Sequence, residues 1–113
     1  MSIVDTIRQV AEFAPDYIHT EAPGYPGVNL YVDSENGLLD ILGEALVRTG
    51  VPSEHLERIQ FTREGSGNAV VPSTLLSRLN KTVSAEDMEF IDKVVNYQDE
   101  GLPWGAAVEA AAY

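Results

Sequence analysis

Two histidines are the side chains of this sequence best suited to acid–base or metal chemistry. His19 lies near Asp16 and Glu21, residue types that together can bind zinc. Zinc-binding helices instead pair two histidines about four residues apart, and His55 lies far from His19 in the sequence. The sequence therefore predicts no metal site, and we expect His55, between two glutamates, to be a hydrated surface residue.

Two glycine-rich turns, at residues 24–27 and 65–67, are the next candidates. Neither turn matches the dinucleotide or phosphate-loop pattern. The second turn lies beside Arg63 and could hold an anion on its backbone N–H groups, with a flexible connector as the simpler interpretation. Ser66 has no histidine or lysine at a motif spacing, so no serine nucleophile is predicted.

Four carboxylates gather in the sequence between residues 21 and 40: Glu21, Asp33, Glu35 and Asp40. Two carboxylates in one pocket can divide the roles of acid and base. A small enzyme that depends on carboxylates alone is therefore one hypothesis. Because no complete catalytic set is visible, we expect a protein that is not an enzyme and that needs no cofactor.

Aromatic side chains favour binding over catalysis. Tyr25 lies in a loop rich in proline and glycine, Tyr31 in the apolar stretch that follows, and Tyr97 and Trp104 on either side of a helix break. Such side chains often anchor protein–protein contacts. We predict Tyr25, Tyr31, Tyr97 and Trp104 as partner-binding residues, with burial of Trp104 in the core as the alternative.

Composition limits the class of protein. The chain of 113 residues predicts a single acidic globular domain over residues 1–113, and the absence of cysteine excludes disulfides and thiolate sites. No apolar run approaches the roughly 20 residues of a membrane span, and the N-terminus lacks a basic segment followed by an apolar one. We expect a cytoplasmic protein without membrane contact.

The formal net charge of −11 disfavours direct binding to nucleic acid. The charge is uneven, at −8 over residues 1–57, +3 over residues 58–83 and −6 over residues 84–113. The basic segment could pair with the acidic C-terminal segment of a second copy, or the two could neutralise each other within one chain. A homodimer is therefore a possible assembly.

Hydrophobic periodicity and capping residues predict helices at residues 3–14, 37–49, 53–59, 72–80, 84–101 and from Trp104 onward. Ser2 and Ser84 are suited to cap helix starts, and Gly50 and Gly101 to end helices. Residues 17–20 and 28–32 are β-branched and aromatic around a turn-rich loop, which predicts a small β-hairpin near residues 17–33. The expected fold class is mainly α (α+β), a compact bundle of about five short helices.

Two segments carry a family resemblance. Residues 43–52 follow the pattern G-x-A-L-x-x-x-G-V-P, and residues 98–108 follow Q-D-x-G-x-x-W-G-x-A-V. With the strand-like Leu30–Tyr31–Val32 they resemble small uncharacterised proteins of actinobacteria and their bacteriophages, over about half of the chain. The resemblance implies an origin and a fold but no activity. Where those proteins carry cysteine or histidine in the central helix, this chain has Asp40 and Glu44.

These observations favour a small non-catalytic interaction or regulatory protein that binds a host or partner protein, in keeping with a phage origin. The alternative is a DNA mimic, whose acidic surface would occupy the groove of a DNA-binding protein. Its support is the net charge and the absence of Lys and Arg between Arg8 and Arg48. The basic segment at residues 58–83 weakens that alternative.

Overall fold

A computed structural model describes residues 2–20, 30–62 and 69–112. Within these ranges the chain forms six α-helices and one antiparallel two-stranded hairpin, which confirms the predicted mainly α fold with a small β element. The elements are α1 (Ile3–Phe13), β1 (Val32–Asp33), β2 (Leu38–Leu39), α2 (Ile41–Arg48), α3 (Ser53–Ile59), α4 (Pro72–Arg78), α5 (Ala85–Asp99) and α6 (Trp104–Ala111).

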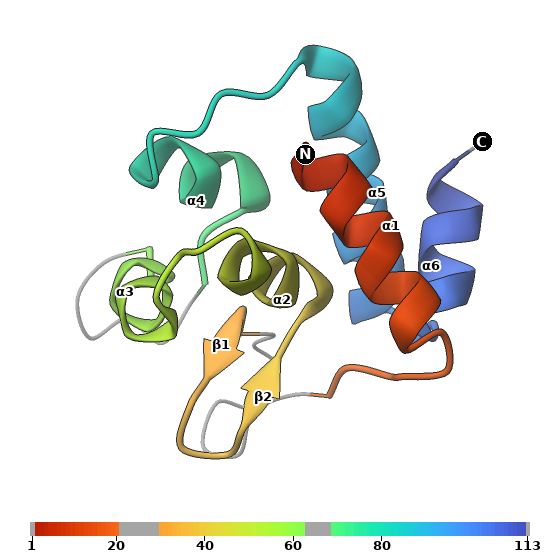
Figure 1. The fold of residues 1–113 in the computed structure, drawn as a ribbon, viewed down its shortest axis with the longest axis horizontal. Coiled ribbons are helices and arrows are strands. Elements are labelled where there is room, and N and C mark those ends of the chain that lie inside the picture. Colours follow the sequence, from red (N-terminus) through yellow and green to blue (C-terminus); the bar gives the residue numbers. More distant parts are fainter. Residues whose placement is uncertain (1, 21–29, 63–68, 113) are drawn as a thin grey trace.

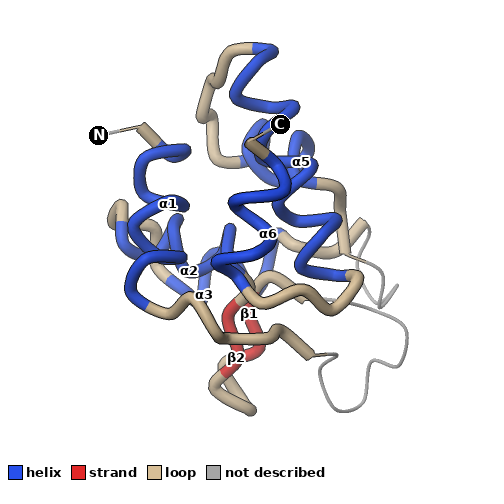
Figure 2. Tube along the Cα trace, turned by 90° about the vertical axis from the view of Figure 1, so that its right-hand side faces the viewer, coloured by secondary structure: helices blue, strands red, loops and turns tan. Residues whose placement is uncertain are grey.

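The helices α1, α5 and α6 lie together on one side of the molecule (Figure 1). α1 packs against α2 and α6, and the longest helix, α5, packs against α1, α2, α4 and α6 (Figure 1). The short helix α3 packs against α2 and β1, the short helix α4 packs against α5, and the hairpin lies at the end of the molecule away from both termini (Figure 2). One apolar core runs between these helices, with Ile7, Leu42, Leu56, Leu75 and Ile91 fully buried.

The predicted start of α1 and the predicted ends of α5 agree with the structure. The Ser2 hydroxyl accepts a hydrogen bond from the Asp5 N–H, and the Ser84 hydroxyl does the same for Asp87, each at 3.1 Å. Gly101 ends α5 with φ +104°; its N–H donates to the Gln98 carbonyl at 3.0 Å, and the Leu102 N–H donates to the Tyr97 carbonyl at 3.1 Å, in a Schellman arrangement. These local contacts explain why sequence alone placed α1 and α5 well.

The hairpin lies later in the chain than predicted. Val32 pairs with Leu39 and Asp33 with Leu38, whereas residues 17–20 form no strand and residues 21–29 lie outside the described part. Leu38 and Leu39 thus belong to β2, although periodicity assigned them to the second helix. The reason is Asp40, whose carboxylate accepts the Gly43 N–H as an N-cap. The helix α2 therefore begins at Ile41, the residue after Asp40, and not at residue 37.

Two features hold the hairpin against the helices. The side chain of Gln60, fully buried at the end of α3, accepts the Val32 N–H at 3.0 Å and donates to the Val32 carbonyl at 2.9 Å. It pairs with β1 as a neighbouring strand would. Gly43 of α2 lies so close to the backbone that a Cβ there would overlap the Tyr31 carbonyl oxygen.

Substitution of Gly43 by alanine should therefore lower stability. Glycine to alanine inside a helix normally raises stability by about 1 kcal/mol. Here the added methyl group forces α2 away from Tyr31, whose carbonyl also accepts the Asp40 N–H, at a cost of about 2 kcal/mol or more. Urea unfolding of the Gly43→Ala variant checks this, and a stability gain would contradict the close approach.

Candidate functional site

The amide of Gln98, at the end of α5, is the centre of a buried polar network. Its oxygen accepts the Ile41 N–H at 2.7 Å and the Trp104 indole N–H at 2.9 Å. Its nitrogen donates to Asp40 at 3.4 Å and to Asp99 at 3.1 Å. All the hydrogen-bonding capacity of the amide is thus used, and the network joins the start of α2 to the turn between α5 and α6.

Asp40 is the acidic member inside the core, with 1% of its surface exposed. Its donors are neutral amides: the backbone N–H groups of Leu42 and Gly43, and the side chain of Gln98. Burial raises the pKa of Asp40 well above its usual value, the Asp99 charge adds to the rise, and these hydrogen bonds oppose it. Charged Asp40 is therefore costly, and protonation relieves that cost.

Asp99 lies at the rim of the network, where the residue as a whole is exposed. Partial burial of its carboxyl group raises the pKa of Asp99 to about 6, against the effect of the hydrogen bond from Gln98. Gln98 was not singled out in the sequence, although it follows Val94 by four residues and Ile91 by seven. That spacing places it on the buried face of α5 and was the signal for a buried amide.

The structure does not bring the four predicted binding aromatics together on the surface. Tyr31 is buried, and its hydroxyl donates to the Val70 carbonyl at 2.6 Å. Trp104 is buried too, and its indole N–H donates to Gln98. This agrees with the alternative prediction that Trp104 belongs to the core. Neither ring is open to a partner. Tyr97 is half-buried, and Tyr25 lies outside the described residues.

Other apolar side chains are exposed instead, at the end of α1. Phe13, Ile18 and Tyr17 have 79%, 50% and 37% of their surface exposed. We call residues 13–18, which lead out of α1, the exit segment. Its six residues extend over at most about 20 Å, so their side chains can contact one partner surface. Phe13 lies off the apolar stripe of α1, formed by Ile3, Ile7 and Val10, and this was the available sequence signal.

The backbone of the exit segment is fixed by α6. The Trp104 N–H donates to the Tyr17 carbonyl and the Gly105 N–H to the Pro15 carbonyl, both at 2.9 Å. The Tyr17 ring packs on the Trp104 ring, with centroids 4.4 Å apart. A Cβ at Gly105 would lie 3.0 Å from Pro15, so the close approach depends on glycine. The segment thus displays apolar side chains on a held backbone.

A groove of about 280 Å³ between α1 and α6 adjoins this segment through Pro15. Ala11, Pro15, Gly105 and Val108 contribute apolar lining, and Glu12 and Glu109 line it from the two helices. The nearby arginines are engaged with rings, since Arg8 lies 4.6 Å from the Phe90 centroid and Arg48 lies 5.2 Å from the Phe13 centroid. The groove is small and largely apolar, and it is bordered by Glu12, Glu109 and Arg8.

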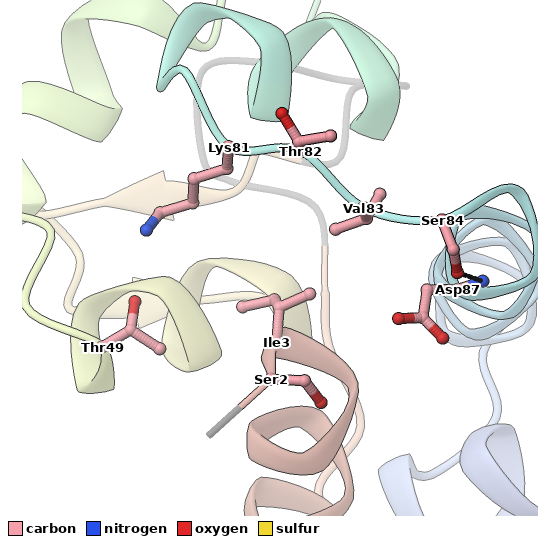
Figure 3. Close-up of a pocket in the computed structure, with 8 residues that line it drawn as sticks. All are labelled: Ser2, Ile3, Thr49, Lys81, Thr82, Val83, Ser84 and Asp87. Atoms are coloured by element: carbon pink, nitrogen blue, oxygen red, sulfur yellow. Dashed lines mark hydrogen bonds between the residues drawn. The ribbon is translucent and has the colours of Figure 1, made fainter.

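A second pocket, of about 500 Å³, opens between the starts of α1 and α5 (Figure 3). Ser2 and Ser84 lie there as helix caps, with Lys81 on one side and Asp87 on the other. The capping hydroxyls already accept backbone N–H groups, and Asp87 opposes an anion. The pocket contains no nucleophile paired with a base.

His19, Asp16 and Glu21 are the residues considered for a zinc site. Among residues 2–20, 30–62 and 69–112, no group of three or more His, Asp or Glu side chains could hold a metal ion. Burial lowers the pKa of His19, whose Nε2 lies 3.2 Å from the Leu30 carbonyl, and its Nδ1 has no partner. Glu21 lies outside the described part. His19 therefore connects the chain just after the exit segment to Leu30 through its ring Nε2.

Within the described ranges, no helix is long and apolar enough to cross a membrane. Comparison with protein-family models, with curated proteins and with solved structures finds no match to this chain.

Replacing Gln98 by methionine should destabilise the protein by about 3 kcal/mol. The substitution keeps the volume but leaves the Ile41 and Trp104 N–H groups buried without an acceptor. Urea unfolding measures the loss, and the fluorescence of the only tryptophan should report its new surroundings. Asn96→Ala, on the exposed side of α5, is the matched control and should change stability by less than about 0.7 kcal/mol.

Asp99→Asn should raise stability at neutral pH. Because the folded-state pKa of Asp99 is raised to about 6, the folded protein binds its proton more tightly than the unfolded chain. Wild-type stability therefore falls as pH rises from about 4 through about 6. Melting temperatures should be higher for the variant at about pH 7.5 and converge with the wild type near pH 4. A constant difference at both pH values would contradict the raised pKa.

Proposed function

We propose that this protein is a non-catalytic interaction protein, and that it binds a protein partner through the exit segment. The observation that carries the proposal is the 79% exposure of Phe13 together with the fixed backbone that follows it. Exposed apolar groups that are already held in place lose little conformational freedom on binding. The Phe13 ring keeps most of its surface in water even with the Arg48 guanidinium 5.2 Å from its centroid, and that exposed apolar surface is available to a partner.

The charges around the segment favour a basic partner. Glu12, Asp16 and Glu109 are exposed, while Arg8 and Arg48 lie over aromatic rings. The net charge of −11 would speed the approach of a positively charged protein. We infer a partner surface with an apolar side chain at its centre, for Phe13 and the groove, and lysine or arginine around it.

Origin and location enter the proposal only as expectations. The resemblance of residues 98–108 to proteins of actinobacteria and their phages supports a search for the partner in an actinobacterial cytoplasm. A DNA mimic would also bind a basic protein, but it would do so through carboxylates alone. Dependence of binding on Phe13 distinguishes the two.

Phe13→Ala should weaken partner binding by about tenfold or more, the scale of a central anchor. The partner is first found by photo-crosslinking from position 13 and from position 71, and its affinity for the purified variants is then measured. Val71 is also exposed, at 61%, but lies at the N-cap of α4, away from the exit segment, so Val71→Ala is the matched control and should bind as the wild type. Equal losses for both variants, or identical crosslinks, would reject the exit segment as the binding site.

A further inference from the structure

We propose that Asp40, Gln98 and Asp99 form a proton-sensitive latch between the start of α2 and the turn joining α5 to α6. The geometry is that of one amide group between two carboxyl groups. The Gln98 oxygen faces two N–H donors, so its nitrogen is forced to face Asp40 and Asp99. The amide cannot turn over, because its NH₂ group would then meet the Ile41 and Trp104 donors.

The two carboxyl groups are close enough to interact. Both accept from the same nitrogen, at 3.4 Å and 3.1 Å, so these two oxygens can lie no more than about 6.5 Å apart. Asp40 is shielded from water, and a neutral amide is what separates it from Asp99. When only one of the two carboxyl groups is charged, the Gln98 NH₂ group stabilises that charge by a hydrogen bond. When both are charged, Asp40 and Asp99 repel each other, and the burial of Asp40 limits the screening of this repulsion by water.

The other groups around the latch do not cancel this repulsion. Tyr31 lies nearby with its proton donated to Val70, and Asp92 of α5 adds another negative charge to the same region. α6 contributes the neutral indole of Trp104, and α2 contributes backbone N–H groups. Burial and the acidic neighbours raise the pKa of Tyr31, which keeps its hydroxyl group protonated at neutral pH.

The direction of the response follows from these pKa shifts. Asp40 and Asp99 both have raised pKa values, so proton uptake favours the folded arrangement. At low pH the pair is neutral or singly charged, and the latch is closed. As pH rises through about 6, Asp99 becomes charged; once Asp40 is charged as well, the pair carries two charges, and the contacts of Gln98 with Ile41 and Trp104 loosen.

The latch is also connected to the surface assigned to partner binding. Gln98 holds the indole of Trp104, and the other side of that residue holds Tyr17 by a hydrogen bond and by ring packing. A looser latch would therefore loosen the exit segment. This consequence rests on the proposed function, whereas the latch itself is independent of any partner.

The indole N–H of Trp104 provides a direct measurement. The chain has one tryptophan, so this proton gives a single NMR signal, and its hydrogen-exchange protection reports the bond to Gln98. In the wild type, protection corrected for the intrinsic effect of pH should fall about tenfold between about pH 5 and about pH 8. In Asp99→Asn the fall should be about threefold or less, because the pair can no longer be doubly charged.

Two controls separate the latch from general acidity. Glu100→Gln removes the carboxyl group that follows Asp99 in the chain, and Glu86→Gln removes an exposed carboxyl group in the first turn of α5, far from the latch; both variants should keep the wild-type fall. The side-chain carboxyl ¹³C signal of Asp40 should titrate at lower pH in Asp99→Asn than in the wild type. Constant protection in the wild type, an undiminished fall in Asp99→Asn, or an unchanged Asp40 titration would overturn the proposal. These readouts need no partner, so they stand apart from the Phe13 test.

Discussion

The rest of this structure depends on one buried amide. The Gln98 side chain satisfies the first N–H of α2 and the indole that begins α6, and it donates to the carboxyl groups of Asp40 and Asp99. Residues 57 and 58 positions away in the sequence are thereby fixed against the end of α5. Each missing bond would leave a buried polar group that costs about 1–3 kcal/mol. Apolar packing alone gives no such preference for one arrangement of helix ends.

Sequence patterns predicted correctly those helix ends that depend on contacts between residues close together in the chain. The caps at Ser2 and Ser84 and the end of α5 at Gly101 depend on residues a few positions apart, and they agree with the structure. The hairpin was misplaced, because the assignment of Leu38 and Leu39 depends on whether Asp40 caps α2. Their apolar character suits a helix and a strand equally.

The site could be predicted only in part, because it is built from long-range contacts. The Tyr31 hydroxyl group binds the Val70 carbonyl, 39 residues away, and the Gln98 amide that binds the Trp104 indole is itself held by the start of α2, so the burial of both rings depends on contacts that local patterns do not show. The aromatic criterion thus included two residues, Tyr31 and Trp104, that the core uses. Phe13, which the core does not use, was visible in principle as the residue outside the apolar stripe of α1. Helical position was the better guide than residue type.

Buried and exposed carboxyl groups have different roles in this acidic chain. Exposed residues such as Glu12 and Asp16 are solvated and act at long range, whereas Asp40 is placed where its charge is costly. That cost makes the region sensitive to the protonation of two side chains out of eighteen acidic residues. Because Trp104 lies between this pair and Tyr17, the same ring transmits the state of the buried carboxyl groups to the exposed end of α1. A surface held through a titratable centre can change its rigidity without any change of fold.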